Sequence, residues 1–195
     1  MIVAALRKAM MEKGYAETSL TDLAAGAGLS VSHLLYYFPS KEAVLVELCG
    51  NVVEGILERV TSHKDDPPEE RIHILVDHLL MHGVVPRAEL GFIFELIALA
   101  LHKPEIRNIL RDYNRRIMAY LVDLFEKVPR QPEVSAQDAA AIAAAVWMGL
   151  FTNAQHQELV GDARARVLFR RSLLGLANLK KTAPERNYSP LRARG

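Results

Sequence analysis

The spacing of apolar residues predicts that this chain is helical over most of its length. Apolar side chains recur every three or four positions, and few stretches alternate with the two-residue period of a strand. Glycine, proline and capping residues separate the periodic stretches, as expected where one helix ends and the next begins. Alanine and leucine dominate, and both lose little entropy in a helix. The sequence therefore predicts an all-α fold of about nine helices, at residues 2–13, 19–26, 30–37, 41–62, 69–82, 86–101, 104–127, 136–158 and 163–180.

Composition excludes several classes of protein. Cys49 is the only cysteine among 195 residues, which excludes a disulfide framework and a zinc site built from cysteines. No apolar run reaches the roughly 18–20 residues of a membrane span. Phe92–Leu101 comes nearest and contains Glu95, while Met1–Ala5 is too short and too mixed for a signal peptide. We therefore expect a soluble, cytoplasmic protein without a membrane partner.

The motifs of common enzyme families are also missing. The chain has no glycine-rich phosphate loop, no serine or cysteine nucleophile elbow and no His-Glu metal motif. His78 and His82 lie four positions apart, which can place two imidazoles on one metal ion, but no third ligand is evident nearby. We expect no catalytic residues, no cofactor and no bound metal.

The net charge of +1 is unevenly distributed. Residues 1–50 carry four basic and five acidic side chains, whereas residues 163–195 carry nine basic and one acidic. The basic run around Arg170 is typical of a solvated helix face, and a second DNA contact is the alternative. Residues 182–195 lack apolar periodicity, so we expect a disordered tail.

The segment from Leu23 to Leu34 has the pattern of two short helices that meet at a steep angle. Such a pair needs a small residue at the contact, a turn residue that tolerates positive φ, and apolar residues that pin each helix. Ala24 and Gly28 meet the first two needs, and Leu23, Leu29 and Leu34 meet the third. The outward side of the second helix then carries Val31, Ser32, His33, Leu35 and Tyr36. This helix can enter a DNA major groove, although an ordinary packed helix pair gives a similar pattern.

The residues that follow favour DNA binding. Tyr36 and Tyr37 precede Pro39, and Ser40 caps a new helix with Lys41 in its first turn. A lysine at a helix N-terminus is unfavourable to the helix dipole, and a bound phosphate would remove the conflict.

Together these residues resemble the DNA-binding domain of the TetR family of repressors over residues 4–48. The matching features are Gly14-Tyr15, Thr18 to Ala24, Ala27 to Ser30, Tyr36 to Glu42, and Leu45. The resemblance covers about a quarter of the chain, and the helix count fits the nine-helix plan of the family. It implies a homodimer that binds a near-palindromic operator and releases it when a small ligand enters the C-terminal domain.

The resemblance also implies roles for individual residues. Base edges would be contacted by Val31, Ser32 and His33. Phosphates would be held by Ser19, Thr21, Tyr36, Tyr37 and Lys41. The family usually has glycine or proline at 32, threonine at 33 and tyrosine at 35, where this chain has serine, histidine and leucine. Leu35 removes one expected phosphate contact, for which Tyr36 or His33 would substitute.

Two domains and a C-terminal tail follow from this interpretation. Residues 1–48 form the helix-turn-helix domain, with the helix at 41–62 as the connector. Residues 49–181 form a helical ligand-binding and dimerisation domain, and residues 182–195 form the tail. The resemblance places the ligand pocket among the helices of the second domain. Its candidate residues are His78, His82, Phe92, Glu95, Tyr113, Trp147, Met148 and Phe151.

Glu95 stands out within an otherwise apolar helix. A carboxylate there is paired, turned to solvent or an anchor for a ligand, and structural pairing or exposure is favoured. The other apolar candidates could equally be core. A mainly apolar wall with few polar groups indicates a hydrophobic or amphipathic effector.

The last two helices are candidates for dimerisation. The helix at 136–158 is rich in alanine, which lets another helix approach closely, and the helix at 163–180 carries Phe169, Leu173, Leu176 and Leu179. Two such helices from each subunit could form a four-helix interface. The alternative is a helical hairpin packed only within its own chain.

The sequence therefore predicts a ligand-responsive transcriptional repressor that binds a palindromic operator as a homodimer. The alternatives are a helical small-molecule-binding protein without DNA affinity and, less favoured, an enzyme.

Overall fold

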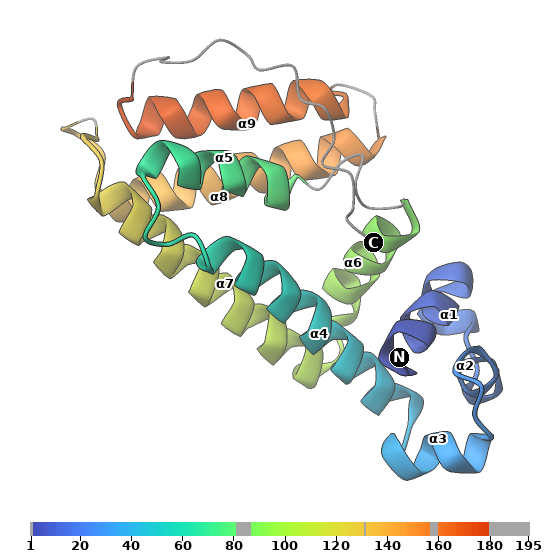
Figure 1. Ribbon diagram of the computed structural model, residues 1–195. Coiled ribbons are helices and arrows are strands. Elements are labelled where there is room, and N and C mark those ends of the chain that lie inside the picture. The colour runs from blue at the N-terminus through green and yellow to red at the C-terminus, as the bar shows by residue number, and fades with distance from the viewer. Residues whose placement is uncertain (1, 81–86, 131, 157–159, 180–195) are drawn as a thin grey trace. The chain divides into compact units, whose positions relative to one another are not determined.

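The computed structural model describes residues 2–80, 87–130, 132–156 and 160–179. In these ranges all regular structure is helical, which confirms the all-α prediction (Figure 1). The helices are α1 (Ile2–Glu17), α2 (Leu20–Gly26), α3 (Val31–Tyr37), α4 (Lys41–Thr61), α5 (Pro68–Leu79), α6 (Arg87–Leu99), α7 (Pro104–Glu126), α8 (Ala136–His156) and α9 (Asp162–Leu176). The predicted tail at 182–195 lies outside the described residues. No described helix is long and apolar enough to cross a membrane.

Helices α2 and α3 begin and end where local signals place them. Ser19 caps α2 in a capping box with Asp22 as the third helical residue. Gly28 has φ of +67°, the left-handed conformation that the turn before α3 requires. Ser30 caps α3 by accepting a hydrogen bond from the His33 N–H. Ala24, the small residue predicted at the contact between the two helices, is buried, and so is Leu34, the residue predicted to pin α3.

Helix α1 differs from the prediction at its C-terminal end. Gly14 interrupts the helix as predicted, but one further helical turn follows it and reaches Glu17. Gly14 itself has φ 76° and ψ 163°, outside the helical region, so α1 is kinked there. The sequence signal identified the break correctly but could not show that the chain resumes a helical turn after it.

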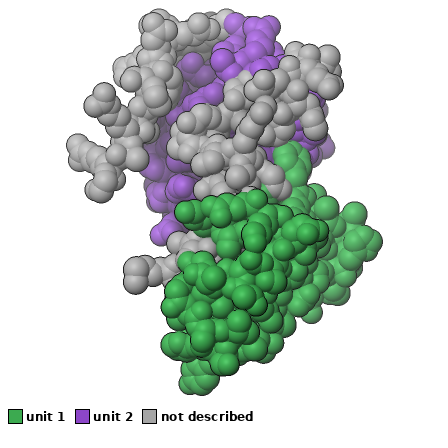
Figure 2. Space-filling view, turned by 90° about the vertical axis from the view of Figure 1, so that its right-hand side faces the viewer, with its two compact units in different colours: residues 1–55, 85–114 green, residues 56–84, 115–195 purple. Residues whose placement is uncertain are grey.

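The chain divides into two compact units (Figure 2). Unit 1 contains residues 1–55 and 85–114, and unit 2 contains residues 56–84 and 115–195. Within unit 1, α1 packs against α2 and α6, and α2 packs against α3; within unit 2, α9 packs against α5 and α8. Helices α4 and α7 each run through both units. The helix-turn-helix therefore shares a compact unit with α6 and the first half of α7.

Unit 2 encloses a completely buried arginine. Arg71 of α5 donates from Nε to the Tyr120 hydroxyl at 3.1 Å and from Nη1 to Asp123 at 2.9 Å. Its Nη2 donates to the Tyr120 carbonyl at 3.2 Å, and the guanidinium lies 4.4 Å from the centre of the Tyr120 ring. A buried charge is tolerated only when it is paired and hydrogen-bonded, so these contacts fix α5 to α7.

Candidate nucleic-acid interface and effector residues

Helix α3 presents an exposed polar and aromatic face. Ser32 and His33 are exposed, Val31 is half-buried, and Leu34 on the opposite side is fully buried. Tyr36 is 82% exposed and Tyr37 is 53% exposed. Two adjacent aromatic side chains at such exposure present both apolar rings and hydroxyl groups to a binding partner.

The aromatic rings of α3 contact one another. The rings of His33 and Tyr37, four residues apart, have centroids 5.4 Å apart. Tyr36 and Tyr37 make an edge-on contact at 5.2 Å. These contacts limit the rotamers of the three side chains, so this face of α3 is partly ordered before any partner binds.

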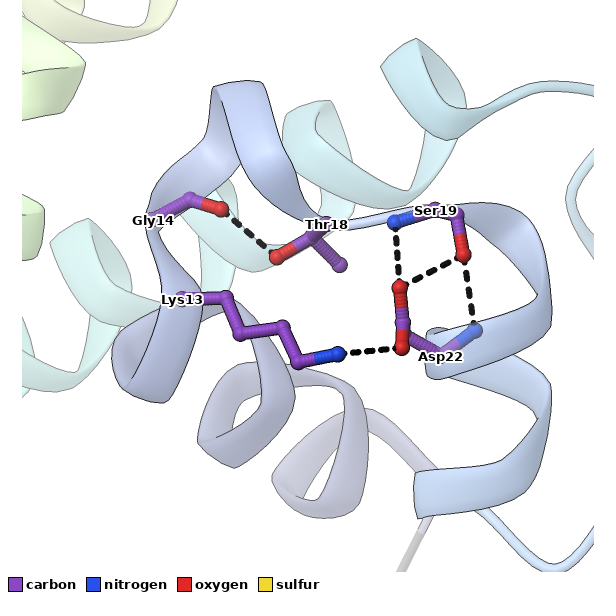
Figure 3. Close-up of polar contacts among 5 residues, drawn as sticks. All are labelled: Lys13, Gly14, Thr18, Ser19 and Asp22. Atoms are coloured by element: carbon purple, nitrogen blue, oxygen red, sulfur yellow. Dashed lines mark hydrogen bonds and ion pairs between the residues drawn. The ribbon is translucent and has the colours of Figure 1, made fainter.

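The start of α2 is held by a local polar network (Figure 3). The Ser19 hydroxyl donates to Asp22 Oδ2 at 2.5 Å and accepts from the Asp22 N–H at 3.1 Å. Lys13 of α1 donates to Asp22 Oδ1, and this bond, followed by those from Ser19, holds the pKa of Asp22 far below its usual value. Thr21 is exposed. The Ser19 proton is therefore engaged within the protein, whereas Thr21 faces solvent.

Lys41 is bound to the last turn of α1. Its ammonium donates to the Tyr15 carbonyl at 2.8 Å and to the Ala16 carbonyl at 3.4 Å. It also lies 4.3 Å from the centre of the Tyr15 ring. Carbonyls at a helix C-terminus carry partial negative charge, so they relieve the conflict between Lys41 and the α4 dipole within the protein itself. This partner was not visible in the sequence.

Four further contacts complete a group that we call the Tyr15 cluster, namely Tyr15, Lys41, Glu42, Glu95 and Lys103. The Tyr15 hydroxyl donates to Glu42 Oε1 at 2.6 Å, and the Tyr15 N–H donates to Glu95 Oε1 at 2.7 Å. Lys103 lies 3.4 Å from Glu42 and 5.4 Å from the Tyr15 ring centre. Of the three sequence alternatives for Glu95, the structure shows pairing. A role of Glu95 in effector binding stays a prediction.

The Tyr15 cluster gives Glu42 a pH-dependent contribution to stability. The hydrogen bond from Tyr15, followed by that from the Glu42 backbone, lowers the pKa of Glu42 from 4.5 to about 2. A lowered pKa means that the stabilisation is complete above pH 4.5 and is lost as the pH falls towards 2. We expect the free energy of unfolding to fall across this range, and to fall less in Glu42→Gln. Because the Glu42 side chain is 54% exposed, the difference should stay below about 1 kcal/mol.

Urea unfolding followed by circular dichroism at several pH values measures this difference. Glu105→Gln is the matched control, since Glu105 is an exposed carboxylate in the first turn of α7. Equal pH dependence in wild type and Glu42→Gln would contradict the assignment.

Among the effector candidates, the structure brings Trp147 and Phe151 together on α8. Their ring centroids are 6.0 Å apart, and the Trp147 indole N–H donates to the Leu79 carbonyl at 2.8 Å. His78 is half-buried in the same unit, and burial, followed by Arg59, lowers its pKa.

The remaining effector candidates are more scattered. Met148 is 42% exposed. Phe92 and Tyr113 are buried in unit 1, and burial raises the pKa of Tyr113. His82 lies outside the described residues, and no group of three potential metal ligands occurs among those that are described.

Helices α8 and α9 pack on each other within the chain. Ala139, Ala140 and Ala143 of α8 are fully buried, as are Ala165 and Leu173 of α9. The other side of α8 is exposed and carries Ala141, Ile142, Ala145 and Met148. Helices α8 and α9 therefore form a helical hairpin within one chain, and their use in a homodimer interface stays a prediction.

An exposed, capped and pinned α3 after the α2 turn has the geometry of a helix-turn-helix, the class of fold that places its second helix in a DNA major groove. Residues 2–48 match the family of bacterial regulatory proteins of the tetR family, and residues 68–178 match the family "BetI-type transcriptional repressor, C-terminal". The chain belongs to the TetR family of transcriptional regulators, and its larger part is of the BetI type. The prediction of a ligand-responsive repressor is thereby confirmed, and the alternative without DNA affinity is set aside.

Individual proteins agree with the family match. The regulator BetI 2 of Chromohalobacter salexigens is 27% identical over 176 residues, covering 86% of this chain and 82% of the relative. BetI of Escherichia coli is 25% identical over 158 residues, covering 78% and 80%.

Solved structures share the fold. A TetR regulator from Haloarcula marismortui has a TM-score of 0.76 at 20% identity, covering 91% of this chain and 94% of that one. A transcriptional regulator from Saccharomonospora viridis in complex with choline has a TM-score of 0.77 at 20% identity, covering 87% and 92%.

Proposed function

We propose that the protein represses transcription as a homodimer on a near-palindromic operator, and that α3 reads the bases. The observation that carries this proposal is the exposed first turn of α3, with Ser32 and His33 facing solvent and Leu34 buried behind them. A helix that is pinned on one face and polar at its N-terminal end fits the major groove. The repressor would act in the cytoplasm, the compartment of bacterial DNA, and its function needs no catalysis.

The candidates for phosphate contacts can be ranked by the exposure of their side chains and by the hydrogen bonds they already make within the protein. Tyr36, Tyr37 and Thr21 offer hydroxyls to solvent, so they are the strongest candidates. Ser19 would have to give up its bond to Asp22 before it could donate to a phosphate. Lys41 uses two of its three N–H donors on α1, which leaves one for DNA.

The homodimer would form through α8 and α9. The exposed side of α8 carries small residues together with Ile142 and Met148, which are 45% and 42% exposed. Small side chains let two helices approach closely, and the apolar side chains gain burial when a second copy covers them.

Operator selection tests the proposal for α3. The wild-type protein is used to enrich sequences from a random duplex library, and the selection is repeated with His33→Ala. We expect a two-fold symmetric site, and a loss of preference at one base pair in each half-site for His33→Ala, since a good base contact contributes about 1–3 kcal/mol.

His102→Ala is the matched control, because His102 is an exposed histidine of the same unit outside the helix-turn-helix. The proposal fails if the wild type enriches no sequence, or if His33→Ala selects the same site with the same strength.

We further propose that the effector is a small organic cation of the choline class. The regulator from Saccharomonospora viridis is complexed with choline, and this chain places two aromatic rings together on α8. The Trp147 N–H donates to the Leu79 carbonyl, so we assign the ammonium group to the Trp147 ring, and Phe151, which is 4% exposed, lies beside that ring. Aromatic faces bind quaternary ammonium groups through cation–π attraction.

Calorimetry with choline and with its uncharged isostere 3,3-dimethyl-1-butanol separates charge from shape. We expect choline to bind and to release the protein from the operator, and 3,3-dimethyl-1-butanol to do neither. Trp147→Leu should weaken choline binding about 3- to 30-fold, whereas Trp147→Phe should weaken it less. Equal binding of both compounds, or binding of neither, would exclude this effector class.

A further inference from the structure

The kink at Gly14 directs one backbone N–H out of α1. Gly14 lies outside the helical region, and the next N–H, that of Tyr15, donates to the Glu95 carboxylate at 2.7 Å. A Cβ at Gly14 would lie 3.7 Å from the same carboxylate oxygen, so the carboxylate lies directly against the kink. Hydrogen bonds to an ionised acceptor are roughly twice as strong as neutral ones.

The other polar groups of Tyr15 are engaged as well. Its carbonyl accepts from Lys41, and its hydroxyl donates to Glu42. The centre of its ring lies 4.3 Å from the Lys41 ammonium and 5.4 Å from the Lys103 ammonium. Tyr15 itself is only 8% exposed. One residue thus joins the last turn of α1 to the start of α4, to α6 and to the segment between α6 and α7.

The position of α1 bears directly on the DNA-binding helices. The last turn of α1 ends at Glu17, and Ser19, two residues later, caps α2. The buried Thr18 hydroxyl donates to the Gly14 carbonyl at 2.6 Å, which ties this short connection to the kink (Figure 3). A shift of the Tyr15 turn therefore shifts the start of α2.

Glu95 comes from the part of the chain that matches the C-terminal family, residues 68–178, and yet it lies in the same compact unit as the helix-turn-helix. We infer that Glu95 is a positioning residue for DNA binding, which holds the α1–α2 connection in its operator-binding arrangement through the Tyr15 N–H. This inference rests on the proposed use of α3 on DNA. Withdrawal of the carboxylate leaves a part-buried N–H unpaired, which is unfavourable, so α1 must follow α6 or lose this bond.

Two substitutions at one position test the inference. Glu95→Gln keeps an oxygen acceptor for the Tyr15 N–H, and Glu95→Leu has similar size without one. Glu105→Leu, at an exposed glutamate of α7 in the same unit, is the matched control. Three quantities are measured for each variant: affinity for the selected operator, exchange of the Tyr15 amide proton, and the midpoint of urea unfolding.

We expect Glu95→Leu to speed exchange of the Tyr15 amide at least tenfold and to weaken operator binding at least tenfold, because each subunit of the homodimer loses one hydrogen bond. Glu95→Gln should restore both quantities close to wild type, which a role in packing alone would not produce. The inference is overturned if Glu95→Leu binds the operator like wild type, or if Glu95→Gln is as weak as Glu95→Leu. Exchange of the Tyr15 amide proton is measured without DNA, so this part of the test does not depend on the proposed DNA binding. An unchanged exchange rate in Glu95→Leu overturns the inference by itself.

Discussion

The double substitution Tyr36→Ala with Tyr37→Ala is expected to weaken binding to the selected operator about 1,000-fold. Each substitution would remove one hydrogen bond to a phosphate, which contributes about 1 kcal/mol. A homodimer contains two copies of each tyrosine, so the binding free energy would fall by about 4 kcal/mol. The fold should tolerate the change, because the side chains are 82% and 53% exposed. Fluorescence anisotropy with labelled operator measures the affinity, and circular dichroism checks the fold.

Single substitutions separate the hydroxyls from the rings. Tyr36→Phe and Tyr37→Phe remove only the hydroxyl groups and should each weaken binding about 30-fold in the dimer. Leu101→Ala is the control for loss of an exposed apolar surface, since Leu101 is 72% exposed and lies outside the helix-turn-helix. A double variant that binds like wild type, or a Leu101→Ala variant that is equally weak, would refute the assignment.

Arg71→Ala is expected to lower the free energy of unfolding by about 3 kcal/mol, and Tm by about 10 °C. The substitution removes a fully buried side chain, leaves a cavity, and takes away the donors that Tyr120 and Asp123 accept from. Thermal unfolding followed by circular dichroism measures the loss, and Trp147 fluorescence reports on the same unit.

Substitutions of Arg71 and of its partner Asp123 should lower the free energy of unfolding by different amounts. Arg71→Met keeps an unbranched apolar chain in the buried space, so it should cost less than Arg71→Ala. Asp123→Asn should cost less, about 1 kcal/mol, because asparagine keeps an oxygen that can accept from the Arg71 guanidinium, and Arg71 keeps its bonds to Tyr120. If Asp123→Asn lowered the free energy of unfolding as much as Arg71→Ala, the ion pair with Asp123 would contribute most of the stabilisation, and the expectation would be wrong.

The fold could be predicted because its signals are local. Capping serines, glycine with positive φ and prolines mark where helices begin and end, and each acts within a few residues. The helix-turn-helix was predictable for the same reason, since Ala24, Gly28 and Leu34 lie within one short segment and the structure gives each the expected burial or φ.

The long-range polar contacts could not be predicted. Periodicity shows that Glu95 lies on an apolar helix, but not that its partner is a backbone N–H 80 positions earlier. The same holds for Lys41, where the sequence showed an unfavourable charge at a helix start and the structure supplies carbonyls of α1. Arg71 carried no signal at all, because an arginine at a helix start reads as an exposed residue until its burial is known.

The membership of α6 in unit 1 bears on the construction of hybrid regulators. If residues 1–48 were fused to the effector-binding part of a relative, Tyr15 would meet whatever that relative carries in place of Glu95 and Lys103. The hybrid would then have an intact reading helix on an unsupported α1–α2 connection. Exchange of operator specificity between relatives should therefore transplant the α3 surface alone, or carry these two side chains along with the graft.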